Sequence, residues 1–207
     1  MTAVLPEQPG RRERNKARTR EAIVAATRAL ARERGLEQVT VAQIADRAEI
    51  SRRTFFNYFG GVDEVVAAGT ATTLQALGDA FLARPATEDP LAAVAAALRE
   101  HPLDRELLLD WRPAGQLPEH RLHPLHHQVW RHHEEWLVQL LARRVGDADP
   151  LRPRTLAAAL MAFFEVVERA WAPRTVDLDA DEAVAVFNAD LLRALDHARS
   201  GWRPLTR

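Results

Sequence analysis

Two arginines, an asparagine and four aromatic rings lie within ten residues, in the stretch ISRRTFFNYF at residues 50–59. Guanidinium and amide groups bond to the edges of bases in the major groove of DNA, and an apolar ring can contact the methyl group of thymine. Hydroxyl groups suit phosphate oxygens. These residue types therefore indicate a surface that binds double-stranded DNA.

A helix over residues 52–59 would sort these side chains into three sectors, at 100° per residue. Phe55 and Phe59 are four residues apart and share one face, which we expect to be buried. Phe56 is expected either at a thymine methyl or in the same buried anchor. The other expected DNA contacts are Arg52, Arg53 and Asn57 at base edges, and Thr54 and Tyr58 at phosphates. The simpler alternative is an ordinary bundle helix with solvated arginines.

The preceding sequence predicts the helices that hold this one in place. An apolar stripe runs through residues 18–34, and Gly35 ends it. The segment Thr40-Val41-Ala42-Gln43 has the spacing of a capping box and opens a short helix. Ser51 can cap the helix that follows a four-residue turn. Together the two short helices form a helix-turn-helix.

Cap and breaker residues predict helices along the rest of the chain as well, over 63–82, 90–100, 103–112, 124–145, 153–171 and 180–199. No strand or repeat is evident. We therefore predict an all-α protein, with an N-terminal three-helix helix-turn-helix domain and a C-terminal helical bundle. The expected divisions are a flexible basic arm at 1–16, a DNA-binding domain at 17–77, with the helix-turn-helix at about 40–59, and a C-terminal domain at 78–207.

Charge is unevenly divided along the 207 residues, although the net charge is only −1. Residues 1–60 hold twelve arginines and lysines against seven acids, and the remainder holds sixteen against twenty-two. Such a split suggests a basic module joined to an acidic one. The lack of cysteine excludes disulfides, thiol nucleophiles and cysteine-ligated zinc. We see no signal-peptide pattern and no window approaching the roughly 18–20 apolar residues of a membrane span, so we expect a soluble cytoplasmic protein without a membrane partner.

Residues from about 17 to 64 resemble the DNA-binding domain of TetR-family transcriptional regulators. The matching stretches are Arg20-Glu21-Ala22-Ile23 with Ala29-Leu30 and Arg34-Gly35, then Thr40-Val41-Ala42-Gln43-Ile44-Ala45, then Ser51 to Phe59. The resemblance implies that the third helix enters the major groove. It implies that Arg52, Arg53 and Asn57 face bases and that Thr40, Thr54 and Tyr58 face phosphates.

Three positions depart from the usual pattern of that family. Glu49 stands where a turn glycine is common, so a non-glycine residue would adopt a left-handed conformation there. Arg53 also stands where glycine is common and would add a base contact. Val62 stands where a lysine often contacts phosphate. The basic arm, with Lys16 and Arg18 among its six cations up to Arg20, could replace that contact; the alternative is a solvated charged tail.

The resemblance implies that residues from about 70 onward bind a ligand and form a dimer. Two long apolar helices could form a four-helix seam with a second copy, through Leu156, Leu160, Val167, Val184, Phe187, Leu191 and Leu195. Alternatively, these residues form the monomer's own core. Candidate pocket residues are Trp111, Trp130, Phe163 and Phe164, and each has the same alternative.

Two further patterns bear on ligands. The Arg-Arg-Thr-Phe-Phe-Asn-Tyr-Phe run, with an alanine-rich C-terminal part, resembles the subgroup that includes mycofactocin-associated regulators, to which acyl-CoA-type effectors are attached. Six of the eight histidines lie within residues 120–133. Their helical spacing could suit a metal, but few carboxylates and no cysteine lie nearby. We therefore expect a solvated cluster, with no metal and no cofactor.

These observations predict a DNA-binding transcriptional regulator and not an enzyme. We expect a ligand-responsive repressor that binds a pseudo-palindromic operator as a dimer and is released by a small apolar or acyl-type effector. A helical enzyme is the first alternative, but the chain has no Gly-rich phosphate loop, metalloprotease spacing or cysteine nucleophile. The second is a helical small-molecule-binding protein, or an activator, with weakened DNA binding, which Glu49 and Val62 would favour.

Overall fold

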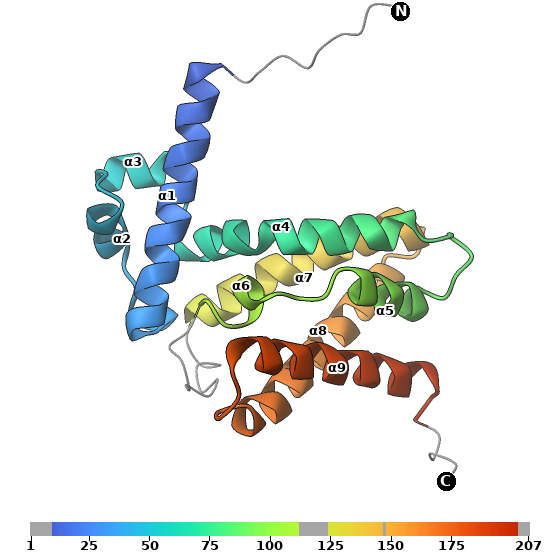
Figure 1. The fold of residues 1–207 in the computed structure, drawn as a ribbon. Coiled ribbons are helices and arrows are strands. Elements are labelled where there is room, and N and C mark those ends of the chain that lie inside the picture. Colours follow the sequence, from blue (N-terminus) through green and yellow to red (C-terminus); the bar gives the residue numbers. More distant parts are fainter. Residues whose placement is uncertain (1–9, 112–123, 147, 203–207) are drawn as a thin grey trace, which may run out of the picture.

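The structure, a computed structural model, describes residues 10–111, 124–146 and 148–202. Within these ranges all regular elements are helices, which confirms the predicted all-α fold. In Figure 1 the first three helices lie at the N-terminal end of α4, α5 to α7 lie along the rest of it, and α8 and α9 lie beyond them. The elements are α1 (Arg11–Arg34), η1 (Leu36–Gln38), α2 (Val41–Arg47), α3 (Arg52–Phe56), α4 (Val62–Ala83), α5 (Pro90–Glu100), α6 (Arg105–Leu108), α7 (Pro124–Val145), α8 (Leu151–Trp171), η3 (Ala172–Arg174) and α9 (Ala180–Arg199).

The first helix begins earlier than its sequence pattern predicts, at Arg11 and not at Arg18. Five of residues 11–20 are arginine, and one each is lysine, glutamate and alanine, all of which favour helix; none is proline or glycine. The expected boundary of a flexible arm at residue 16 is therefore wrong, because Lys16 already lies on a helix. The part of that arm at residues 1–9 lies outside the described residues.

Two other helices are shorter than predicted. Helix α3 ends at Phe56, and Asn57 is its C-cap in a right-handed helical conformation. The amides of Tyr58 and Phe59 still donate to the carbonyl of Phe55, at 2.9 and 3.0 Å, so the last turn keeps its predicted face. Helix α6 has only four residues, and the side chain of Asp104 caps it.

The N-terminal domain is built around side chains from α1, α2, α3 and the start of α4. The predicted stripe on α1 is buried, as is Ile44 on α2. Phe55 and Phe59 are 0% and 2% exposed and belong to the same cluster. This part of the core therefore fixes one face of α3 against α1 and leaves its other faces toward solvent.

Helix α4 is central to the molecule and contacts α1, α5, α6 and α7. Contrary to the expectation from sequence, it is long and apolar enough, by length and composition alone, to cross a membrane. Its apolar side chains instead join the cores of both parts of the protein, through Val65 in the first and Phe81 in the second. Arg144 of α7 closes its C-terminal end by donating to the carbonyls of Phe81 and Arg84 at 2.9 and 3.0 Å, and to those of Pro85 and Glu88 at 2.7 and 3.2 Å.

The apolar faces of α8 and α9 mostly pack within the chain itself. Val167, Phe187, Leu191 and Leu195 are buried in the monomer, which favours the alternative that these residues form the monomer's own core. Leu156, Leu160 and Val184 are partly buried against the same cores. The outward faces of the two helices carry smaller residues, namely Ala158, Ala162 and Val166 on α8 and Ala185 and Ala189 on α9.

Candidate functional site

Side-chain caps determine where the two helices of the helix-turn-helix begin. Thr40 and Gln43 form the predicted capping box, in which the Gln43 amide donates to Thr40 Oγ1 at 3.3 Å and the Thr40 amide donates to Gln43 Oε1 at 2.9 Å. Ser51 Oγ accepts from the Thr54 amide at 2.9 Å and caps α3. Each cap satisfies amide groups that the first turn leaves unpaired.

The turn between these helices contains a residue in an uncommon conformation. Glu49 has a φ of 54°, in the left-handed region where glycine is favoured, which confirms the conformation predicted from its place in the motif. The amide of Ile50 donates to the carbonyl of Ala45 at 2.9 Å and closes the turn. A side chain at this position costs roughly 1–2 kcal/mol relative to glycine, so packing on both sides of the turn maintains it.

Helix α3 presents a cationic and aromatic surface to solvent. Arg52, Arg53 and Asn57 are exposed. Within the described chain neither arginine is held in an ion pair. Phe56 is 58% exposed, and its ring meets Phe55 edge-on at 5.4 Å between centroids. Phe56 thus belongs to the outward surface and not to the buried anchor.

Two other arginines of the domain serve its internal structure. Arg20 donates to the carbonyl of Tyr58 at 3.4 Å and lies over the ring of Phe59, 4.3 Å from its centroid. Arg47 pairs with Glu33 through two bonds of 2.9 Å, which joins α2 to α1. This pairing lowers the pKa of Glu33. Of the basic residues expected near DNA, Lys16 and Arg18 are exposed on α1.

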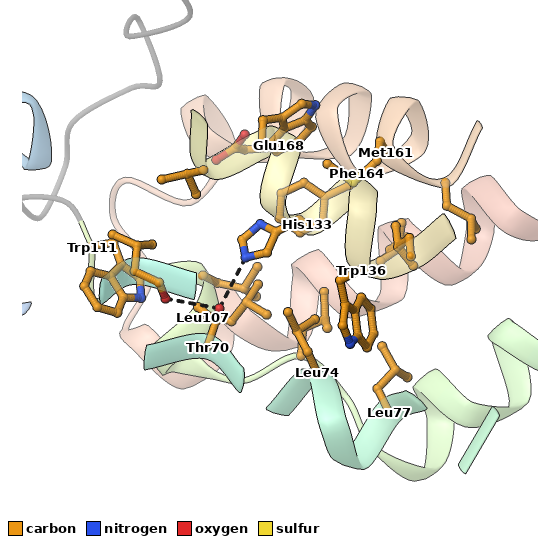
Figure 2. Close-up of a pocket in the computed structure, with 18 of the residues that line it drawn as sticks. Thr70, Leu74, Leu77, Leu107, Trp111, His133, Trp136, Met161, Phe164 and Glu168 are labelled. Atoms are coloured by element: carbon orange, nitrogen blue, oxygen red, sulfur yellow. Dashed lines mark hydrogen bonds between the residues drawn. The ribbon is translucent and has the colours of Figure 1, made fainter. Parts of the chain in front are cut away.

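A cavity of about 230 Å³ lies next to the DNA-binding domain, lined by side chains from η1, α4, α5, α7, α8, α9 and the segment around α6. Figure 2 shows a close-up of it with 18 of its lining residues. Trp111, Trp130 and Phe164 line this cavity, and Trp130 meets Phe164 edge-on at 5.7 Å. Phe163 is absent from the lining and packs against the core of α8 and α9. Most of the remaining wall is leucine.

A small polar cluster interrupts this apolar wall. Thr70 Oγ1 lies 3.2 Å from His133 Nε2, and it also lies 3.3 and 3.2 Å from the carbonyls of Val66 and Ala67. Burial, with a smaller effect of His132, lowers the pKa of His133 to about 4. The imidazole is therefore neutral at pH 7.

The histidines of α7 do not behave as one solvated cluster. His132 bonds to Asp63 at 2.8 Å, at the start of α4, while His133 lines the cavity. His120 and His123 lie outside the described residues, and among the described ones no group of three potential ligands could hold a metal ion. His133 is four residues after Val129 and three before Trp136, which places the three side chains on one face of the helix. This apolar spacing could have predicted that His133 faces inward.

An ionic bridge joins α1 to the segment around α6, a link that sequence reasoning missed. Arg28 pairs with Glu106 at 2.9 Å and donates to the carbonyl of Gly69 at 3.2 Å. Arg32 pairs closely with the buried carboxylate of Asp110. The same segment contributes Leu107, Leu108 and Trp111 to the cavity wall. Residues 105–111 therefore contact the DNA-binding domain on one side and the cavity on the other.

A helix-turn-helix with an outward cationic helix, joined to a helical domain that encloses an apolar cavity, defines the class of ligand-responsive DNA-binding regulators. The model of the family "Bacterial regulatory proteins, tetR family" matches residues 23–68. The transcriptional regulator TcmR of Streptomyces glaucescens is 32% identical, across 98% of this chain and 94% of that protein. The chain therefore belongs to the TetR family of transcriptional regulators.

Two other relatives are more distant. The transcriptional regulator BetI 1 of Chromohalobacter salexigens is 27% identical, over 79% of this chain and 86% of its own length. The solved structure of Thermus thermophilus FadR, a TetR-family repressor in complex with lauroyl-CoA, is 20% identical, with a TM-score of 0.47 over 91% of this chain and 96% of that one. The family and both curated relatives are described as regulators.

Proposed function

We propose that this protein is a repressor that binds a pseudo-palindromic operator in the cytoplasm as a dimer, and that a small apolar effector in the cavity releases it from DNA. The observation that carries this proposal is the position of residues 105–111. Their acids hold Arg28 and Arg32 of α1, and their apolar side chains line the cavity. An acyl-type effector is the alternative for the same cavity.

The side chains of the helix-turn-helix divide into groups suited to base edges and groups suited to phosphates. In our proposal Arg52, Arg53 and Asn57 bond to base edges, and Phe56 contacts a thymine methyl. Thr40, Thr54 and Tyr58 contact phosphates. Lys16 and Arg18 then follow the phosphate backbone from a rigid helix, which requires less ordering on binding than a flexible arm.

A dimer would use the outward faces of α8 and α9. Alanines at positions 158, 162, 185 and 189 are exposed there, and Val166 is 59% exposed. Small side chains allow helices to approach closely, so four such helices from two copies could pack into a bundle. The two recognition helices must then reach half-sites about 34–36 Å apart, one turn of DNA.

The ionic bridge supplies a path from effector to DNA. An effector that displaces Trp111 or Leu107 from the cavity wall would move Glu106 and Asp110, and with them α1. Such an effector changes operator affinity only if it binds the two arrangements of the bridge unequally. Filling the cavity in one arrangement alone would provide that difference.

Substitutions in α3 test the proposal. Arg53→Ala and Tyr58→Phe should each weaken binding to DNA from upstream of the protein's own gene, Arg53→Ala by about 5- to 150-fold, as expected for a base contact worth roughly 1–3 kcal/mol. Arg99→Ala is the matched control, because Arg99 is an exposed arginine on α5. Binding is measured by fluorescence anisotropy and the dimer by size-exclusion chromatography. Parental affinity in both α3 variants would show that α3 is not the recognition helix.

A further inference from the structure

The chemistry of the cavity wall restricts the effector beyond its being apolar. Among the described lining residues there is no lysine or arginine, and two acids, Glu37 and Glu168, are present. Phosphate groups in proteins are bound by cations or by amides at helix N-termini. A ligand with several phosphates would meet neither an arginine nor a lysine among these described residues.

Aromatic side chains form a large part of the same wall. Trp111, Trp130, Trp136 and Phe164 all line the cavity, from the segment after α6, from α7 and from α8. Figure 2 shows Trp111 and Trp136 at opposite ends, with Phe164 between them on the α8 side. Aromatic rings pack well against other flat rings, in offset or edge-to-face contact. This wall therefore suits a flat, rigid body better than a flexible acyl chain.

One hydrogen-bond donor on the wall lacks an acceptor. The side chain of Trp111 is 8% exposed, and its Nε1 is buried with no hydrogen-bond partner. In Figure 2 this nitrogen lies on the edge of the indole ring nearer Thr70. Buried polar groups almost always have partners, because an unsatisfied one costs about 1–3 kcal/mol. A ligand oxygen at this end of the cavity would satisfy the indole N–H.

His133 offers a second polar contact. Thr70 Oγ1 lies within hydrogen-bond distance of His133 Nε2, at 3.2 Å, and of the carbonyls of Val66 and Ala67. Because the imidazole is neutral at pH 7, with its pKa lowered to about 4, one ring nitrogen donates and the other accepts. In either tautomer Nδ1 can bond to a ligand hydroxyl, which itself can donate or accept. Figure 2 shows that nitrogen on the side of the ring away from Thr70.

We propose that the cavity binds an uncharged, planar aromatic molecule that carries a carbonyl or ether oxygen and a hydroxyl group. Trp111 Nε1–H donates to the oxygen, and the hydroxyl, which can donate or accept, bonds to His133 Nδ1. The inference rests on the proposed function, since it names the class of effector for that same cavity. Because Trp111 directly follows Asp110, which holds Arg32, the end of the cavity that recognises the polar groups is also the end attached to α1.

Direct binding tests this proposal without DNA. The probes are 2-hydroxy-9-fluorenone, fluorene, which has the same rings without oxygens, and lauroyl-CoA, which has an acyl chain and phosphates. Titration calorimetry of the unmodified full chain should show one hydroxyfluorenone per chain, bound about 5-fold or more tightly than fluorene, as one or two neutral hydrogen bonds would give. Lauroyl-CoA should bind more weakly than either.

Variants then assign the hydrogen bonds. Trp111→Phe should reduce hydroxyfluorenone affinity by about 5-fold and change fluorene affinity little. Trp202→Phe is the matched control, since Trp202 is 68% exposed and lies outside the cavity lining. The proposal is overturned if hydroxyfluorenone does not bind, if it binds no better than fluorene, or if lauroyl-CoA binds more tightly than both. Because these measurements use no DNA, they can fail while operator binding and its dependence on Arg53 remain intact.

Discussion

Two glycines of α4 give a prediction that tests the packing between the DNA-binding domain and the cavity. A Cβ added to Gly69 would lie 2.3 and 2.7 Å from two ring carbons of Trp111 and 3.1 Å from Val24 of α1. A Cβ added to Gly78 would lie 3.2 Å from Leu140 and from Trp136. The first contacts are too short for any packed atoms, while the second need shifts of only a few tenths of an ångström.

The expected magnitudes follow from two opposing effects. Either Gly→Ala change stabilises the helix by about 1 kcal/mol, because alanine loses less conformational freedom than glycine. At Gly69 this gain is outweighed by overpacking, which costs about 1–3 kcal/mol in a filled core and is here at the high end, because the indole of Trp111 is itself buried. We expect Gly69→Ala to lower the free energy of unfolding by roughly 1–2 kcal/mol, and Gly78→Ala to leave it unchanged or slightly raised.

Urea denaturation followed by circular dichroism measures both variants, at one protein concentration because a dimer's stability depends on it. Trp111→Leu provides a second comparison: it removes the indole, so Gly69→Ala in that background should become neutral or stabilising. Equal stability of the Gly69→Ala and Gly78→Ala proteins would refute the reasoning. So would a Gly69→Ala effect that is unchanged when Trp111 is replaced.

Two further predictions concern His133 and the ionic bridge. Burial lowers the pKa of His133 from 6.5 to about 4, so the folded protein binds this proton more weakly than the unfolded chain does. The stability that the neutral His133 contributes is therefore fully present above pH 6.5 and is lost as the pH falls toward 4. The loss in the free energy of unfolding is at most roughly 3 kcal/mol. Urea denaturation of His133→Leu across this range should show a flatter profile than the parent, and an identical slope would contradict the buried, neutral histidine. Glu106→Gln combined with Asp110→Asn removes the charged partners of Arg28 and Arg32. Amide hydrogen exchange should then become faster in the middle of α1 and stay unchanged in α9. If exchange in α1 equals that of the parent, the ionic bridge does not stabilise α1.

The helix-turn-helix could be predicted well because its determinants are local. The capping box at Thr40, the cap at Ser51 and the four-residue spacing of Phe55 and Phe59 act within a turn or two of helix. Even the left-handed Glu49 followed from its place in the motif. Helix ends were predicted less well. Residues 11–17 carry charges that read as a solvated arm, although their helix propensity extends α1 to Arg11.

The cavity and the bridge depend on contacts between distant segments, which periodicity does not specify. Arg28 and Arg32 have the sequence pattern of a solvated helix face, yet their partners lie 78 residues further along the chain in each case, at Glu106 and Asp110. Similarly, the apolar stripes of α8 and α9 predict that these faces are buried, but not which segment they pack against. In the structure they pack into the monomer's core, as Phe187 does, and the smaller residues of the two helices face outward.

The four carbonyls that Arg144 holds at the end of α4 have a mechanical consequence. Arg144 holds the helix at the end far from the DNA-binding domain, so we expect any tilt of α4 to take place about this point. Its 22 residues extend about 33 Å, so each degree of tilt would displace the opposite end, at Val62, by about 0.6 Å. In the dimer proposed above, a tilt of a few degrees would thus change the spacing between the two copies of α3.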